Sequence, residues 1–144
     1  HRREIPIEIG DNNMPYLDIS ITLHDLQQYS LKTVIDLGAS SNLAIEIQRD
    51  KGLVPPEGSV EGIAHGMGGK VKIHSGRIPE VIFGGFKMEE VVVSFSEGTL
   101  AGIPNPFEKA NLGIGILNRF HVIFDYGNKR MFLEPNSSYC MPFE

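Results

Sequence analysis

Cysteine, basic charge and long apolar runs are all scarce in this chain of 144 residues. The single cysteine, Cys140, excludes an internal disulfide scaffold and a zinc cluster built on thiolates. The formal net charge of -5, without any run of Lys or Arg, offers no basic surface for DNA or RNA. No apolar run approaches the roughly 20 residues of a membrane-spanning helix. We therefore expect neither a nucleic-acid partner nor a membrane span.

Metal-ligand spacing is also missing. No H-E-x-x-H motif or other close pairing relates the five histidines, so no metal site is expected. The first residues, His1-Arg2-Arg3-Glu4, lack the features of a signal peptide. The sequence leaves the cellular compartment undecided, because an export signal upstream of this segment would make the domain periplasmic or membrane-anchored.

Alternation of apolar and polar residues dominates what is present, and the length suits one domain. It begins at Ile5, continues through residues 17–23, and predicts half-buried strands. Further strands are predicted at residues 31–35, 60–64, 70–74, 80–83, 91–95, 121–124 and 130–133. Turn-forming residues separate them at 11–13, 67–69, 84–85 and 126–129. Many short strands at close spacing indicate an all-β barrel or sandwich.

Two short helices and a loop interrupt this pattern. Asn42 is expected to cap a helix over residues 42–51 that stops at Gly52, and residues 116–120 are expected to form a single turn. Gly and Pro residues predict a long surface loop over residues 97–111. Residues 135–144 lose periodicity and resemble the start of a linker.

One acid stands in an unusual setting. Asp36 follows the apolar strand 31–35 directly and opens a turn of small residues, Gly38-Ala39-Ser40-Ser41. Scaffolds expose functional side chains at such places, since Gly allows close approach. A structural turn closed by the Asp36 carboxylate is the alternative.

Other chemistries fit less well. The run Gly66-Met67-Gly68-Gly69-Lys70 lacks the spacing of a phosphate-binding loop and joins two strands, as a hairpin tip or a mobile lid does. Ser40 and Ser41 lack a G-x-S-x-G elbow. Asp125 is the second acid at a strand end, but it is expected to start the hairpin turn that follows it.

Residues 34–42, Val-Ile-Asp-Leu-Gly-Ala-Ser-Ser-Asn, resemble the signature of retropepsin-like aspartic proteases, in which two apolar residues precede Asp-Thr/Ser-Gly-Ala-Ser. Residues 112–126 resemble the apolar-Gly segment, short helix and closing strand near the end of such domains, and residues 128–135 follow in the same manner. The Gly-tipped hairpin 61–74 lies between them, where this family has its flap. The likeness spans most of the chain in the family's order and is closest to bacterial aspartyl-protease-like domains.

The resemblance implies a closed-barrel-like acid protease fold over residues 1–134, with Asp36 as the catalytic acid beneath the flap. It implies an active-site loop of Leu37, Gly38, Ala39 and Ser40, supported by Leu112 and Gly113. It also implies that the flap and substrate-binding residues are Ile63, Ala64, His65, Gly66, Met67, Gly68 and Gly69. Bacterial members often continue into a PDZ-like module, and residues 135–144 would then begin the linker to it.

Aspartic proteolysis needs two carboxylates that share a proton. With one such motif in the chain, the resemblance implies that a second copy supplies the other Asp36, in a two-fold homodimer that cleaves an extended peptide or protein. No metal or organic cofactor is implied.

Leu37 departs from the family. Thr or Ser usually stands there, and its hydroxyl ties the two catalytic loops together across the dimer, whereas Leu offers neither donor nor acceptor. The departure predicts weaker dimerisation or lost catalysis. An active endopeptidase and a catalytically silent domain that binds peptides or protein partners are therefore the two expected functions.

Overall fold

The computed structural model describes residues 2–66, 69–98 and 109–144, and most of them form strands. The strands are β1 (Arg3–Pro6), β2 (Glu8–Ile9), β3 (Pro15–Thr22), β4 (Gln28–Ile35), β5 (Leu43–Glu46), β6 (Val60–Gly66), β7 (Gly69–Phe83), β8 (Phe86–Ser96), β9 (Ala110–Leu112), β10 (Phe120–Asp125) and β11 (Arg130–Pro135). The helical pieces are α1 (Ile114–Leu117) and the 3-10 turns Arg49–Lys51 and Tyr126–Asn128. Within the described residues, no helix has the length and apolar character needed to cross a bilayer.

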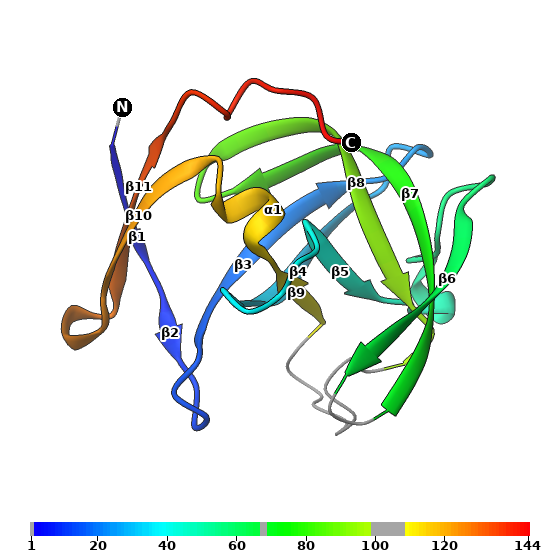
Figure 1. The fold of residues 1–144 in the computed structure, drawn as a ribbon, viewed down its shortest axis with the longest axis horizontal. Coiled ribbons are helices and arrows are strands. Elements are labelled where there is room, and N and C mark those ends of the chain that lie inside the picture. The colour runs from blue at the N-terminus through cyan, green and yellow to red at the C-terminus, as the bar shows by residue number, and fades with distance from the viewer. Residues whose placement is uncertain (1, 67–68, 99–108) are drawn as a thin grey trace.

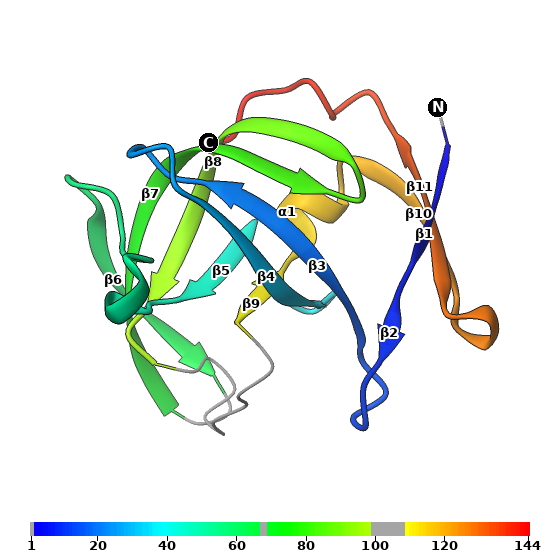
Figure 2. The same cartoon turned by 180° about the vertical axis from the view of Figure 1, so that it is seen from behind.

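Six strands close into a barrel. They pair in the order β3-β4-β9-β5-β8-β7, and a further pairing of β3 with β7 joins the two ends. β2 and β6 extend the sheet outside this ring, while β1, β11 and β10 form a separate three-stranded sheet on one side of the barrel (Figures 1 and 2). The expectation of an all-β, closed-barrel fold is confirmed at this level.

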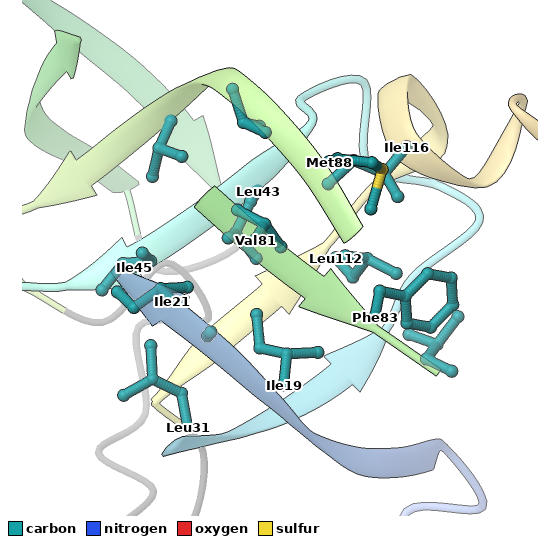
Figure 3. Close-up of a cluster of buried hydrophobic side chains, with 14 of the residues drawn as sticks. Ile19, Ile21, Leu31, Leu43, Ile45, Val81, Phe83, Met88, Leu112 and Ile116 are labelled. Carbon is teal, nitrogen blue, oxygen red and sulfur yellow. The ribbon is translucent and has the colours of Figure 1, made fainter. Parts of the chain in front are cut away.

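Apolar side chains at alternate positions along the strands fill the barrel. On β3, Leu17, Ile19 and Ile21 are buried, whereas Asp18 and Ser20 between them are exposed. Residues from seven elements meet inside, as Figure 3 shows for Ile19, Ile21, Leu31, Leu43, Ile45, Val81, Phe83, Met88, Leu112 and Ile116. This burial of apolar area is the main stabilising contribution to such a domain.

The short strand β9 determines where the loop of residues 36–42 lies on the barrel. It pairs in parallel with β4 and antiparallel with β5, so it lies between the two strands that flank residues 36–42. The pairing places Leu112 beside Ile35 on one side and Leu43 on the other. The loop that carries Asp36 therefore begins and ends against a segment far along the chain.

The prediction of a helix over residues 42–51 is wrong. Residues 43–46 form β5, which pairs with β8 and β9, and only Arg49–Lys51 are helical. Leu43 and Ile45 are completely buried, and the two strand partners that β5 gains outweigh local helix propensity. Gly52 does end the 3-10 turn in a left-handed conformation, with φ of 75°.

Three other expected boundaries shift. The single helical turn lies at Ile114–Leu117 rather than 116–120, because Phe120 already pairs in β10. The end of the expected loop, residues 110 and 111, belongs to β9, while residues 99–108 lie outside the described part. The two strands expected within residues 70–83 are one strand, β7, because it pairs with both β6 and β8.

The turn residues are where the sequence places them. Gly84 and Gly85 have φ of 58° and 81° between β7 and β8, and Asn13 has φ of 60° between β2 and β3. Lys129 has φ of 51° ahead of β11. Left-handed backbone at these positions reverses the chain with few residues.

The segment after β11 packs against the barrel. Phe143 is buried, and the Arg119 guanidinium donates to the backbone carbonyls of Ser138, Tyr139 and Pro142. Burial lowers the pKa of Arg119. Figure 1 shows this segment crossing the barrel from β11 to β8. A continuation into a PDZ-like module stays a prediction.

Candidate functional site

Asp36 stands immediately after β4 and is partly exposed. Its Oδ1 accepts from the Gly38 backbone N–H over 2.9 Å, and its backbone N–H donates to the Leu112 carbonyl over 2.9 Å. The Ala39 N–H donates to the Asp36 carbonyl over 3.2 Å, which closes the turn. The carboxylate is thus anchored at one oxygen by its own loop and remains reachable from solvent.

The loop is fastened to the segment after β9 by backbone hydrogen bonds. Ile114 donates to the Ala39 carbonyl over 2.9 Å, and Gly115 donates to the Ser41 carbonyl over 3.2 Å. Gly113 donates to the Asn42 carbonyl over 3.0 Å. Leu112 is fully buried beneath the loop. The two segments expected to act together are therefore joined.

Asn111 is a site residue that sequence reasoning missed. Its side-chain Nδ2 donates to Asp36 Oδ2 over 3.2 Å, so both carboxylate oxygens accept a hydrogen bond. Gly and Pro are frequent just before it, so the sequence predicts a surface loop at this position. A signal was present, since Asn111 directly precedes the Leu112-Gly113 pair of the apolar-Gly segment.

Leu37 projects from the same loop. Its side chain is 60% exposed, while Ser40 is also exposed and makes no hydrogen bond within the described residues. The leucine side chain has neither a hydrogen-bond donor nor an acceptor.

The expected flap is a hairpin of β6 and β7 that extends from one end of the barrel (Figure 1). The pairing runs from Val60 opposite Ser75 to Gly66 opposite Gly69. Ile63 and His65 are exposed on β6, and Ala64 between them is half-buried. Met67 and Gly68 lie outside the described residues. Among the described residues, no hydrogen bond or ion pair joins the hairpin to the Asp36 loop.

A charged cluster fixes the base of this hairpin. Glu97 Oε1 lies 2.8 Å from Arg49 Nη2 and 3.1 Å from His74 Nε2. Glu61 lies 3.3 Å from Lys72 and 3.9 Å from His74 Nδ1. The hydrogen bond from Arg49, with a smaller contribution from His74, lowers the pKa of Glu97. The hairpin is thereby tied to the end of β8 and to the 3-10 turn.

Asp125 has the structural role expected of it. Its Oδ1 accepts from the Asn128 backbone N–H, and its Oδ2 accepts from the side chains of Asn128 and Arg130 over 2.9 and 2.8 Å. The Asn128 and Arg130 hydrogen bonds hold the pKa of Asp125 below its ordinary value. It starts the hairpin turn between β10 and β11.

The expected site residues do not line the groove beside β1 and β3. A groove of about 850 Å³ lies between β1 and β3, lined by residues such as Arg3, Tyr16 and Lys32, and it includes none of the expected site residues. No cluster of three or more potential metal ligands occurs in the described ranges. The site is therefore defined by the Asp36 carboxylate and its hydrogen bonds.

No protein-family model matches the chain, and no curated protein matches it.

Proposed function

We propose that this chain is one half of a retropepsin-like aspartic endopeptidase, in which Asp36 from two copies forms the catalytic dyad. The observation that carries the proposal is the setting of Asp36: a partly exposed carboxylate, held at both oxygens, in a loop fastened from a distant segment. The closed barrel and the hairpin of β6 and β7 agree with the fold that such an enzyme requires.

The chemistry follows from two carboxylates that share one proton. The ionised carboxylate accepts a proton from water as the water oxygen attacks the scissile carbonyl, while the protonated one donates to the carbonyl oxygen. The resulting diol collapses as one hydroxyl gives its proton to the ionised carboxylate, while the protonated carboxyl group donates to the leaving nitrogen and the C–N bond breaks. One proton is then again shared by the pair.

A substrate in extended conformation suits the free edge of the hairpin of β6 and β7. β6 is the last strand of its sheet, so its outer edge has no strand partner among the described residues. An extended peptide adds to such an edge through backbone hydrogen bonds, and pockets for alternate side chains then give selectivity.

Catalysis is tested with Asp36→Asn, which removes the acid but keeps its shape. Wild-type protein should cleave a mixture of unstructured peptides at mildly acidic pH, and the variant should not, at an unchanged melting temperature. Asp11→Asn, an exposed acid in the turn between β2 and β3, is the matched control and should cleave normally. Equal cleavage by wild type and Asp36→Asn would exclude the mechanism.

The shared site is tested by mixing. If each dyad needs two chains, adding excess Asp36→Asn protein to wild type should suppress cleavage, because mixed dimers carry one Asp36. Excess Asp11→Asn should not suppress it. Activity that depends only on the amount of wild-type chain would show that one chain is sufficient.

A catalytically silent domain is the second candidate, and Leu37 favours it because its side chain has no hydroxyl to join two catalytic loops. Such a domain would bind peptides or protein partners without cleaving them at any pH, and Asp36→Asn would bind them as well as wild type. Titration of a fluorescent peptide pool against both proteins, with cleavage followed by mass spectrometry, separates the two functions.

A further inference from the structure

Asn111 is a polar residue on a strand whose neighbours are buried and apolar. Ala110 and Leu112 belong to the hydrophobic core, so Asn111 faces the opposite side of β9. Its strand partners are Val34 and Ala44, which are buried but lie outside the core cluster. A residue in this position contributes nothing to the barrel core.

The nitrogen and the oxygen of the Asn111 side-chain amide differ in their hydrogen bonding. Nδ2 donates to Asp36 Oδ2, whereas Oδ1 is buried and has no hydrogen-bond partner among the described residues. An ionised carboxylate only accepts hydrogen bonds, which fixes the amide with its nitrogen toward Asp36. A buried acceptor without a partner reduces stability, and the described residues supply none to Asn111 Oδ1.

The contact completes the support of the acid. Gly38 holds Oδ1 through its backbone N–H and Asn111 holds Oδ2, so the plane of the carboxylate is fixed from two sides. Leu37, the residue between Asp36 and Gly38, has no side-chain donor. Among the described residues of one chain, Asn111 is thus the side chain that donates a hydrogen bond to Asp36.

We infer that Asn111 is a positioning residue for the Asp36 carboxylate: its amide fixes Oδ2 so that the remaining lone pairs point toward the attacking water and the second carboxylate. The inference rests on the proposed function. It assigns to Asn111 an effect on turnover rather than on substrate binding, because the contact is made to the acid and not to substrate.

Asn111→Leu is the decisive variant, since leucine has a similar volume and neither donor nor acceptor. We expect kcat to fall about 10- to 100-fold, the range seen when a supporting hydrogen bond to a functional group is lost, with KM changed less than about threefold. The melting temperature should be no lower than that of wild type, because the unpaired acceptor is removed with the donor.

Asn111→Asp tests whether turnover depends on a hydrogen bond donated from position 111 to Asp36. At higher pH the new carboxylate repels Asp36, whereas at lower pH a protonated carboxyl group can donate to it again. Its kcat relative to wild type should therefore rise as pH falls, while Asn111→Leu stays equally impaired across the same range. Asp36 is the titratable group in hydrogen-bond contact with Asn111 in the described part of the chain.

Asn136→Ala is the matched control. It removes an amide that donates to the Asn118 carbonyl over 2.8 Å, at the start of the segment after β11, and should retain wild-type kcat. An unchanged kcat in Asn111→Leu, an equal loss in Asn136→Ala, or an Asn111→Asp profile that follows Asn111→Leu would overturn the inference. If wild type shows no Asp36-dependent cleavage, the proposed function fails and the inference falls with it; dependence on Asp36 without dependence on Asn111 refutes the inference alone.

Discussion

Gly113 lies directly against the backbone of Ser41: a Cβ atom at Gly113 would lie 2.1 Å from the Ser41 carbonyl oxygen and 2.9 Å from that of Ala39. Both neighbours are backbone atoms and cannot rotate away. The absence of a side chain at Gly113 is therefore what lets the segment after β9 reach the Asp36 loop.

Gly113→Ala should disrupt this approach. We expect the free energy of unfolding to fall by about 1–3 kcal/mol, as for other overpacked sites, with a larger proportional loss of cleavage because the loop must shift. Urea denaturation and peptide cleavage measure the two effects. Gly98→Ala is the control, since a Cβ there meets no atom of the described residues within 4 Å, and it should change stability little. Equal effects of the two substitutions would refute the packing argument.

Leu37→Thr tests the missing hydroxyl. If the two catalytic loops meet across a two-fold axis, the Thr hydroxyl supplies the hydrogen bond that leucine lacks, and dimerisation should tighten or cleavage rise. Sedimentation velocity over a range of concentrations measures the association. Ile123→Thr, at an exposed apolar residue on β10, controls for the loss of apolar surface. No change in either association or cleavage would count against the hydroxyl argument.

Asp125 should make the stability of the folded protein depend on pH. Its hydrogen bonds with Asn128 and Arg130 depress the pKa below its ordinary value, so the folded state binds the proton more weakly than the unfolded chain does. This contribution is fully present above the unfolded value of about 3.9 and is lost as pH falls through the lower folded pKa.

Asp125→Asn should accordingly lower the melting temperature at pH 7 and lower it less near pH 3, where the wild-type carboxylate is itself being protonated. Thermal denaturation at both pH values checks this. Asp18→Asn, at an exposed acid on β3, provides the comparison for a general change in net charge. A deficit in Asp125→Asn that is the same at both pH values would show that the charge on Asp125 is irrelevant.

Glu97 should hold the hairpin of β6 and β7 to the barrel. Glu97→Gln weakens its contacts with Arg49 and His74, so the amide hydrogens of β6 should exchange faster while those of β3 do not change. Hydrogen exchange followed by mass spectrometry gives both rates. Glu57→Gln, at an exposed acid in the turn before β6, is the control. Unchanged exchange on β6 would exclude a tie through Glu97.

Much of the barrel was predictable because its signals are local. Alternation on β3 directs Ile19 and Ile21 inward, and Gly84-Gly85 adopts the left-handed backbone that a short hairpin needs. The turn that Asp125 starts was also expected, since its partner Asn128 is only three residues away. Strand period and turn chemistry act over a few residues, so a sequence carries them openly.

Other elements could not be predicted from the local sequence pattern. Residues 43–46 have a helical spacing of Leu43 and Ile47, yet they form a strand because β8 and β9 offer hydrogen-bond partners on both sides. Only three residues make up β9, and they adjoin a Gly- and Pro-rich stretch that reads as loop. Long-range pairing decided both cases, and local propensity is too weak to oppose it.

The sequence by itself determined that this chain is an all-β domain with one acid, Asp36, opening a turn of small residues. It could not show that Asn111 contacts that acid, because 75 residues separate them in the chain. Only the tertiary structure brings them together, by inserting β9 between β4 and β5. The reason is physical: the backbone hydrogen bonds that bury β9 between two strands also carry Asn111 to the carboxylate, and that pairing depends on the whole barrel.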